Sequence, residues 1–418
     1  MKFKLTNLEK KWVLYDVANS AFILMVTTVI PILFNNIATE ENLSSSQYLS
    51  YWGTAVSIAT LISAILGPFL GRASDMKGVK KPMFIGIILI GSIACLLLGF
   101  LNSWLSFLII FVISKIAFSI ANVLYDSMLI DITSDERMDE VSSQGFAWGY
   151  IGSVIPFILS LLLIFFADNI GISADIASKI GLIITGLWWF LLSIPLLKAY
   201  EHNHYRNTLG ENPFKELGKT LKEVYKNKII FIFLLAFFFY IDGVQTIINM
   251  AMSYGTSLGL GAQGLLLALL VTQFVAFPST LIIARISKKV KVEKLISICI
   301  IAYLGIVIVG MNMTSLLEFW ILAIAVGLFQ GSIQALSRSY FAKLIPKNES
   351  GAYFGLYDIF GKGASFIGTF TMSAVTAITD SPRIAIASIA IFFVIGLILF
   401  LVSVKKKNDT SIKYRREV

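Results

Sequence analysis

Long apolar runs alternate with short polar segments along the whole chain. A helix that crosses a bilayer needs about 20 mostly apolar residues, and twelve runs meet this requirement. They cover residues 12–35, 48–71, 82–101, 104–131, 141–166, 178–198, 229–253, 262–286, 294–312, 316–343, 351–376 and 383–404. The pattern predicts an all-α membrane protein with twelve transmembrane helices.

The longest polar stretch, residues 199–228, separates six runs from six. It predicts an N-terminal six-helix bundle over 1–198, a cytosolic linker over 199–228 and a C-terminal six-helix bundle with a basic tail over 229–418. Inside the linker, apolar residues recur at helical spacing among lysines: Phe214, Leu217, Leu221, Val224 and Tyr225. This spacing favours an amphipathic helix on the inner membrane surface, with a partner-binding helix as the alternative.

Composition agrees with a membrane protein and excludes several other classes. Hydrophobic residues make up 57% of the chain and charged residues 14%, against about 25% charged in soluble domains. The 32 Phe residues exclude a disordered chain. Cys95 and Cys299 lie in apolar runs, and His202 and His204 lie in a loop without further ligands, so we expect no disulfide framework, metal or cofactor.

The basic residues are distributed unevenly between the two sides of the predicted membrane. If the N-terminus is cytosolic, 29 of the 34 Lys and Arg residues lie on that side, and only Lys179 and Arg383 lie outside. Cytosolic loops of membrane proteins are enriched in Lys and Arg. We therefore expect both termini in the cytosol, a location in the cell membrane, and no nucleic-acid partner despite the net charge of +9.

Polar residues inside the runs form four stripes, in the first, fourth, seventh and tenth runs. A charge in a membrane span costs at least about 2.5–3.5 kcal/mol, so such residues tend to be functional or paired. Each stripe falls on one helical face; the members are Asp16, Asn19, Ser20 and Thr27; Lys115, Ser119, Asn122 and Asp126; Asp242, Gln245, Thr246 and Asn249; and Gln330, Gln334, Ser337 and Arg338. The repeat every three runs predicts that these four helices line a water-filled cavity, with hydrogen-bonded helix–helix seams as the alternative.

Glycines four residues apart occur in the second, fifth and eleventh runs, as Gly67 and Gly71, Gly145 and Gly149, and Gly351 and Gly355. Small residues at this spacing let helices approach closely. They suit interfaces that slide when two bundles rock, and static close packing explains them equally well.

The segment from Gly71 to Lys81, GRASDMKGVKK, joins the second and third runs. It resembles the signature loop of the major facilitator superfamily, with a Gly, an Asp four residues later, another Gly and then basic residues. Gly78 suits a tight turn, and Asp75 suits a helix cap that also meets a basic residue. The two six-run halves agree with this resemblance.

Within that superfamily the chain resembles the vacuole-effluxer-like family, whose fungal members include the vacuolar amino-acid effluxer. The matching segments are spread over both halves: YDVANSAF at 15–22, VSSQGFAWGY at 141–150, DGVQTI at 242–247, QALSRS at 334–339 and FGLYD at 354–358. The resemblance implies a transporter of a small polar solute such as an amino acid.

We expect a secondary transporter that works by alternating access, in which two bundles rock about a central site.

 The full phosphate-binding pattern Gly-x-x-x-x-Gly-Lys-Ser/Thr is not found in the sequence, so an ion gradient is the expected energy source. Two alternatives stay open: efflux of amphipathic drugs, and, in another class, a non-transporting membrane sensor or enzyme. An enzyme would need a nucleophile–base pair or a metal cluster, and no such intramembrane group is found in the sequence.

The stripes supply the candidate binding residues. We expect the solute to contact residues near the middle of the membrane and along the cavity: Asp242, Gln245, Thr246, Asn249, Lys115, Asn19, Gln330, Gln334 and Lys362. Two lysines and several amides suit a carboxylate or zwitterion better than an amphipathic cation. Lys362 is equally well explained by an ion pair with Asp358, one helical turn away.

Coupling and gating are assigned to a second set of residues. Asp242 is the candidate proton carrier, because it is central and has no basic residue within a turn; sodium coupling is the alternative, with Gln245 and Asn249 as further oxygen ligands. Near the cytosolic face lie Asp16, Asp126, Arg338 and Asp358, and an Asp126–Arg338 pair is expected when that side is closed. Gly71, Asp75 and Gly78 complete the gating set, and we expect a monomer.

Overall fold

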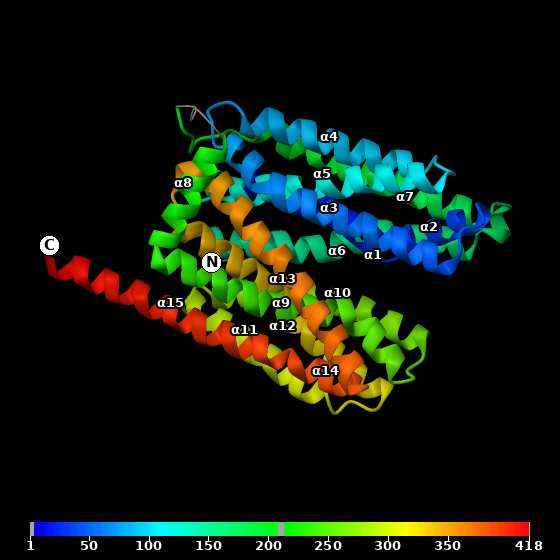
Figure 1. Cartoon of the computed structure of the whole chain (residues 1–418). Coiled ribbons are helices and arrows are strands. Elements are labelled where there is room, and N and C mark those ends of the chain that lie inside the picture. The colour runs from blue at the N-terminus through cyan, green and yellow to red at the C-terminus, as the bar shows by residue number, and fades with distance from the viewer. Residues whose placement is uncertain (1–3, 208–212, 418) are drawn as a thin grey trace. The chain divides into compact units, whose positions relative to one another are not determined.

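A computed structural model describes residues 4–207 and 213–417, and these residues are almost entirely helical (Figure 1). The first half of the chain forms α1 (Asn7–Thr27), α2 (Val29–Glu40), α3 (Ser45–Ser74), α4 (Lys80–Leu98), α5 (Trp104–Ile132), α6 (Met138–Phe165), η1 (Asp168–Ile170) and α7 (Ala174–Ala199). The second half forms α8 (Pro213–Lys226), α9 (Lys228–Ser257), α10 (Ala262–Ile286), α11 (Val292–Gly310), α12 (Leu316–Leu344), η2 (Lys347–Glu349), α13 (Ser350–Thr379), α14 (Pro382–Ser388) and α15 (Ala390–Glu417).

The helices coincide with the apolar runs of the sequence. Among the described residues, ten helices are long and apolar enough to cross a membrane, and the bent pair α1–α2 makes an eleventh span. The 30-residue helix α13 occupies the eleventh apolar run, and α14 and α15 share the last. The predicted all-α membrane fold is confirmed.

The first span is broken, which the run of apolar residues did not predict. The axes of α1 and α2 differ by 42°, and Thr28 between them has φ −129° and ψ −74°. Pro31 explains the break, because it has no N–H to donate and its ring collides with the carbonyl one turn earlier. Near the break, the hydroxyl groups of Thr27 and Thr28 donate to backbone carbonyls of the preceding turn, at Ile23 and Leu24.

Contacts divide the chain into two compact units, and each unit contains helices from both halves of the sequence. The first unit comprises Met1–Ser134, Trp148–Leu209 and Lys347–Gly355. In it α4 packs on α5 and α7, α1 on α7, and α3 on α5. Aromatic rings fill the space between α1 and α5, where Trp12 stacks on Tyr125 with ring centroids 4.4 Å apart.

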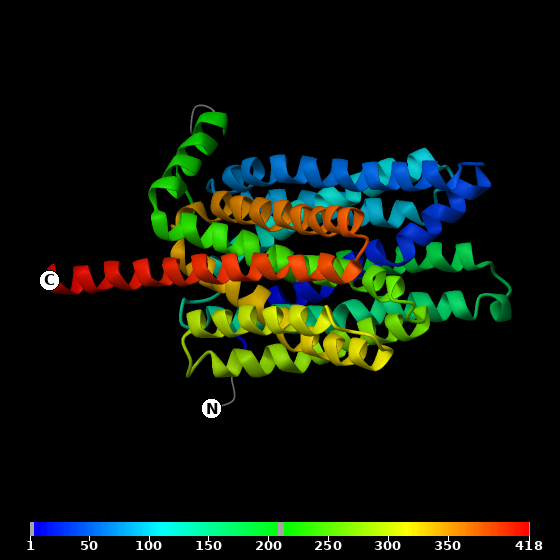
Figure 2. The same cartoon turned by 60° about the horizontal axis from the view of Figure 1, so that its bottom comes forward.

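The second unit comprises Asp135–Ala147, Gly210–Pro346 and Leu356–Val418. Its main helix pairs are α10 with α12, α9 with α15, and α11 with α12 and α15. Glycines permit the close pairs: Gly243 of α9 faces the ring of Phe393, and Gly396 of α15 faces Tyr240. Beyond these contacts α15 runs past the ends of α9 and α11 (Figure 2).

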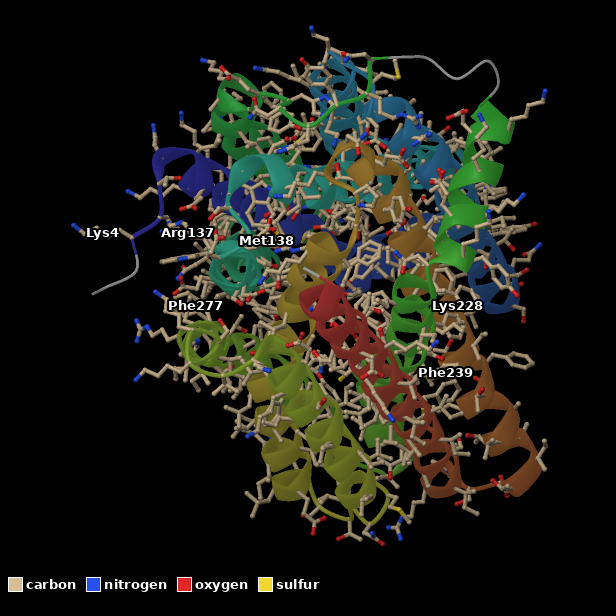
Figure 3. The ribbon with its side chains drawn as sticks, turned by 90° about the vertical axis from the view of Figure 1, so that its left-hand side faces the viewer. Lys4, Arg137, Met138, Lys228, Phe239 and Phe277 are labelled. Carbon is tan, nitrogen blue, oxygen red and sulfur yellow. The ribbon has the colours of Figure 1, made fainter. Side chains whose placement is uncertain are left out.

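Two helices are shared between the units. The first residues of α6 belong to the second unit and the remainder to the first, while the first turns of α13 belong to the first unit and the remainder to the second. Figure 3 looks onto the end of the second unit at which α6 begins with Met138 and α9 with Lys228. Each shared helix therefore carries contacts of both units along its length.

The predicted amphipathic helix of the linker is α8, which packs against α9. Val224 is buried, whereas Leu221 and Tyr225 stay largely exposed. Lys228 lies 4.1 Å from the centroid of the Tyr225 ring. The exposed apolar side chains are consistent with a membrane-surface helix, which stays a prediction.

Candidate functional site

Asp242 is completely buried in α9, although it is a carboxylic acid within a membrane span. Its Oδ1 accepts hydrogen bonds from the backbone N–H of Gly368 at 2.9 Å and from the hydroxyl of Thr246 at 3.3 Å. Its Oδ2 is also buried and has no hydrogen-bond partner among the described residues. A buried oxygen without a partner is costly and marks a candidate functional atom.

The remaining members of the α9 stripe lie in different surroundings. Gln245 is half-buried and Asn249 is exposed. The structure therefore brings Asp242 and Thr246 together and joins them to α13, which the spacing on α9 alone did not indicate. Gly368 was missed, because its role follows from its place beside Asp242 and not from its residue type.

On α13 itself, Lys362 forms an ion pair with Asp358, one turn earlier. Both side chains are mostly buried, with exposed fractions of 26% and 18%. Of the two sequence interpretations of Lys362, the pair with Asp358 is the contact that is present. A role of Lys362 in solute binding stays a prediction.

Gln330 and Gln334 lie on α12, one turn apart. The Gln334 amide donates to the Gln330 carbonyl oxygen at 3.0 Å. The Gln330 side chain is 2% exposed, and its Nε2 has no partner among the described residues. Gln330 also forms part of the wall of a cavity.

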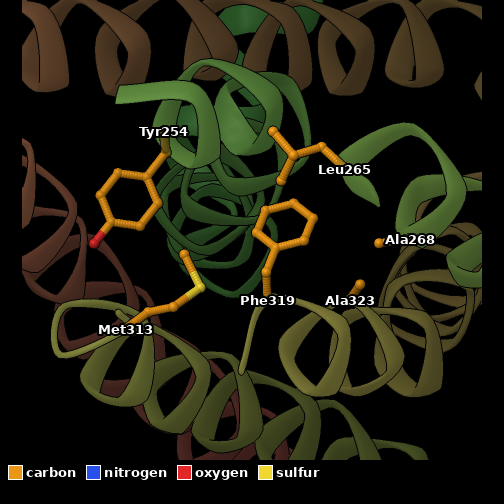
Figure 4. Packing of buried hydrophobic residues seen from close by; sticks show 6 residues of the cluster. All are labelled: Tyr254, Leu265, Ala268, Met313, Phe319 and Ala323. Carbon is orange, nitrogen blue, oxygen red and sulfur yellow. The ribbon is translucent and has the colours of Figure 1, made fainter. Parts of the chain in front are cut away.

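That cavity lies inside the second unit and has a volume of about 90 Å³. It is lined mainly by α9, α10, α11 and α12, with Met372 of α13 and Ile386 of α14. Its walls are mostly apolar and include Tyr254, Met313, Phe319 and Ala323, which Figure 4 shows grouped together. Gln330 adds an amide to this apolar surface. This apolar cavity was not predicted, because the polar stripes of the sequence indicated only a water-filled one.

The first unit holds the stripes of α1 and α5. Asn19 donates to Asn122 at 2.5 Å, and the Tyr125 hydroxyl donates to Asp16 at 3.0 Å. Asn19 and Asn122 thus form a hydrogen bond between the two stripes, while Tyr125 lies outside the α5 stripe. Whether the two stripes line a cavity or form a helix–helix seam stays a prediction. Lys115, half-buried on α5, lies 5.9 Å from the centroid of the Phe111 ring.

Arg338 is buried on α12 and binds the first turns of α6 within the second unit. Its Nε donates to the Ser142 hydroxyl and its Nη2 to the Ser142 carbonyl, each at 2.9 Å. Its guanidinium lies 4.3 Å from the centroid of the Phe146 ring. Sequence reasoning missed these two partners, although both lie in the segment 141–150 that carries the family resemblance. The expected pair of Arg338 with Asp126 stays a prediction.

Two further ion pairs bind the same segment of α6. Lys343 of α12 pairs with Asp139 at 2.6 Å, and Lys288 pairs with Glu140 at 2.9 Å. Together with Arg338 they place three basic residues of the second half of the chain against residues 139–146. This segment is a candidate gating element.

The loop between α3 and α4 contacts the start of α13 within the first unit. The two oxygens of Asp75 accept the backbone N–H groups of Gly351 at 2.7 Å and Ala352 at 3.0 Å. Burial raises the pKa of Asp75 to about 6, while Lys80, 3.8 Å away, and the two N–H groups act in the opposite direction. A carboxylate at a helix N-terminus is stabilised by the helix dipole.

The surrounding residues strengthen this contact. Lys80 donates to the Ser350 hydroxyl at 2.9 Å, and Arg72 pairs with Glu349 at 3.1 Å. A Cβ atom on Gly71 would overlap the backbone carbonyl of Gly351, and Gly78 has φ +76°. Gly71, Asp75 and Gly78 thus occupy positions that their residue types suit.

Asp131, at the end of α5, holds the first residues of the linker. Its side chain is 1% exposed and accepts from the Tyr200 hydroxyl at 2.6 Å and from the backbone N–H of His204 at 3.0 Å. The His204 Nδ1 lies 2.8 Å from the same carboxylate. Burial and the charge of Lys80 lower the pKa of His202 to about 4, so this histidine is neutral at pH 7. Sequence reasoning missed this cluster, because only the polarity of the linker pointed to it.

Sequence comparison finds relatives over nearly the whole chain. The profile of the family described as "Vacuole effluxer Atg22 like" matches residues 7–411. The uncharacterized MFS-type transporter YxiO of Bacillus subtilis (strain 168) is 41% identical over 427 residues, which cover 100% of this chain and 99% of YxiO. Autophagy-related protein 22 of Kluyveromyces lactis is 22% identical over 396 residues, 85% of this chain and 79% of the relative.

Structure comparison finds the same superfamily. The proton:xylose symporter XylE, a protein of the major facilitator superfamily, superposes with a TM-score of 0.70 at 14% identity. The match covers 95% of this chain and 94% of that chain. At this identity the likeness concerns the fold alone, and the fold is that of the major facilitator superfamily.

Proposed function

Because this chain belongs to the Atg22-like vacuole effluxer family of the major facilitator superfamily, it is a membrane transporter and not an enzyme, and we propose that it moves a small polar solute by alternating access. The solute is an amino acid or a related zwitterion or anion. The transporter works in the cell membrane as a monomer, with both termini in the cytosol. In alternating access, two bundles rock around a central site.

The polar side chains of the spans support this solute class. Lys115 and Lys362 offer positive charge, and Asn19, Gln245, Gln330 and Gln334 offer amide donors and acceptors. These groups match a carboxylate and an adjacent polar group better than an amphipathic cation. The paired state of Lys362 and Asp358 supports an exchange of partners, in which a solute carboxylate competes with Asp358 for the ammonium group.

Coupling to protons is proposed through Asp242, and the single observation that carries it is the buried Oδ2 without a partner. Oδ1 already accepts two hydrogen bonds, and a backbone N–H beside the carboxylate opposes a bound cation. Sodium usually takes several oxygen ligands, as calcium does; exposed Asn249 and half-buried Gln245 form no such cage. A proton needs one oxygen.

The contacts of the α3–α4 loop with α13 and of Arg338 with α6 are proposed as the cytosolic gate. Each combines buried charge with hydrogen bonds to a helix of the opposite half of the chain. Asp16, Asp126 and Asp358 lie toward the same predicted side. Breaking the contacts of the α3–α4 loop with α13 and of Arg338 with α6 would accompany opening to the cytosol.

Transport by the purified protein in proteoliposomes tests the function. The assay uses a mixture of radiolabelled amino acids in sodium-free buffer, with and without an imposed pH gradient. We expect uptake that the gradient drives in the wild type and that Asp242→Asn abolishes. Uptake that requires sodium and ignores the pH gradient would contradict proton coupling, and uptake unchanged in Asp242→Asn and Lys115→Ala would contradict the site.

The apolar cavity beside Gln330 favours one second candidate, efflux of amphipathic drugs, because such compounds bind apolar walls with few polar groups. Ethidium accumulation in cells that express the protein separates the two functions. Lower ethidium accumulation, together with no amino-acid transport, would favour the drug pump.

A further inference from the structure

We propose that Oδ2 of Asp242 is the atom that binds the proton, that Gly368 is the residue that positions this site, and that α13 links the site to the contact with the α3–α4 loop. The inference rests on the proposed proton coupling. It adds the residues that make proton binding at Asp242 depend on the conformation of the protein. A series of contacts supports this inference: Asp75 accepts from the start of α13, and Gly368 further along α13 donates to Asp242.

Gly368 is required for the contact between α9 and α13. A Cβ atom at this position would overlap Oδ1 of Asp242 and the hydroxyl of Thr246. Its absence lets the carboxyl group reach the α13 backbone, where the Gly368 N–H donates at 2.9 Å. Gly368 is itself buried, so the contact is shielded from water.

The two carboxyl oxygens have different surroundings. Oδ1 accepts from Gly368 and Thr246, so a hydroxyl proton on Oδ1 would displace one of these donors. Oδ2 has no hydrogen-bond partner among the described residues. The proton therefore binds to Oδ2, and the two donors to Oδ1 stabilise the ionised form.

Among the described residues, no charged side chain forms an ion pair or a hydrogen bond with Asp242. The charged residues of α13, Asp358 and Lys362, pair with each other. On α12, Arg338 binds Ser142 and Lys343 binds Asp139. The other packed helices carry the following charged residues: Lys215, Glu216, Lys219, Lys222, Glu223 and Lys226 on the linker helix α8, Arg285 on α10, Glu318 on α12, and Lys405, Lys406, Lys407 and Asp409 on α15. The hydrogen bond from Gly368 is thus the contact that changes when α13 moves relative to α9, whereas Thr246 lies on α9 together with Asp242.

Helix α13 spans both units. Gly351 and Ala352, in the first unit, donate to Asp75. Gly368, in the second unit, donates to Asp242 and lies 16 positions after Ala352, about 24 Å further along a helix. A shift of α13 at its first turn is transmitted to Gly368 because a hydrogen-bonded helix moves as a rigid element. When Gly368 withdraws, the anion loses a donor and takes up a proton.

Infrared difference spectroscopy tests the site without a known solute. The full chain in lipid nanodiscs is titrated with acid, and the carbonyl band of protonated carboxyl groups is recorded in the wild type and in Asp242→Asn. We expect one titrating component that Asp242→Asn lacks. In Gly368→Ala and in Thr246→Val the midpoint of that component moves upward by about one pH unit, because the anion loses one hydrogen bond.

Gly361→Ala is the matched control. It lies on the same face of α13 two turns earlier, and a Cβ there would meet only the Phe237 ring, at an ordinary distance of 3.5 Å. It should leave the midpoint unchanged. Asp75→Ala, which releases the first turn of α13, should move the midpoint in the same direction as Gly368→Ala.

The outcomes separate the inference from the proposed function. If Asp242→Asn removes no component, Asp242 binds no proton, and both proton coupling and the inference are wrong. If the component exists but Gly368→Ala and Thr246→Val leave its midpoint unchanged, only the positioning role of Gly368 fails. If Asp75→Ala alone has no effect, the link through α13 fails. Transport of amino acids is measured independently and decides the solute.

Discussion

At the scale of single residues, Arg338 shows why a buried cation in a span need not bind the solute. Its guanidinium makes two hydrogen bonds to Ser142 and stacks on Phe146. Lysine keeps the charge but cannot reproduce the planar fork of donors. We expect Arg338→Lys to lower the free energy of unfolding by about 2–3 kcal/mol, measured by thermal unfolding in detergent.

The control for this substitution is Arg383→Lys. Arg383 is exposed and makes a hydrogen bond of 3.3 Å to the Met313 carbonyl. Substitutions at such surface positions have small effects. Equal melting temperatures of the wild type and Arg338→Lys would show that the contacts of Arg338 with α6 contribute little to stability.

Asp75 is a second residue with a measurable signature, in its pH dependence. Because burial raises the pKa of Asp75 to about 6 in the folded chain, from about 3.9 in an unfolded one, the folded form binds the proton more tightly. The contribution of Asp75 to stability is therefore full below pH 4 and is lost as the pH rises through 6. Asn cannot titrate, so Asp75→Asn does not lose stability in this way. The melting temperature of Asp75→Asn minus that of the wild type should therefore increase by several degrees between pH 4.5 and pH 7.5. A pH-independent difference would contradict the raised pKa.

At the scale of elements, the first linker residues act as a strap across the end of α5. Tyr200 and His204 bond to Asp131, and Arg206 forms a backbone bridge with Met76 of the α3–α4 loop. We expect Asp131→Ala to release residues 200–206. Loss of about 1.4 kcal/mol or more in local stability makes opening at least tenfold more frequent, and the rate of tryptic cleavage after Arg206, followed by mass spectrometry, should increase accordingly.

Tyr205→Phe is the matched control for the strap. Tyr205 lies in the same segment, and its ring faces the ammonium group of Lys77 at 5.2 Å, a contact that phenylalanine retains. It should leave the cleavage rate unchanged. Equal cleavage of the wild type and Asp131→Ala would mean that Asp131 does not hold the linker.

The elements also show what sequence could and could not predict. The helices followed from the apolar runs, because a span must satisfy its backbone internally. The break at Thr28 was missed, although Pro31 is the residue that causes it. Asp242 was found because a carboxyl group in a span is unusual in itself. Gly368 and the Gln330 cavity were not found, because each depends on which helices pack together, and a helical stripe reports only the face of one helix.

At the scale of the whole molecule, the family and the fold leave the orientation in the membrane to be tested. The distribution of Lys and Arg predicts that both termini and the α3–α4 and α10–α11 loops are cytosolic. Lys77 lies in the first of these loops and Lys291 in the second, while Lys179 lies near the start of α7 on the predicted outer side. The reversed orientation would place 29 basic residues outside, against the positive-inside rule.

Cysteine labelling in intact bacterial cells measures this orientation. The native cysteines, Cys95 and Cys299, are buried and are replaced by alanine. A single cysteine is then introduced by Lys179→Cys, Lys77→Cys or Lys291→Cys, and cells are treated with a membrane-impermeant maleimide. We expect labelling of Lys179→Cys alone in intact cells and of all three after the cells are opened, because only the outer loop meets the reagent. Protection of Lys179→Cys together with labelling of Lys77→Cys and Lys291→Cys would reverse the orientation and would move the proposed gate at Asp75 and Arg338 to the outer face.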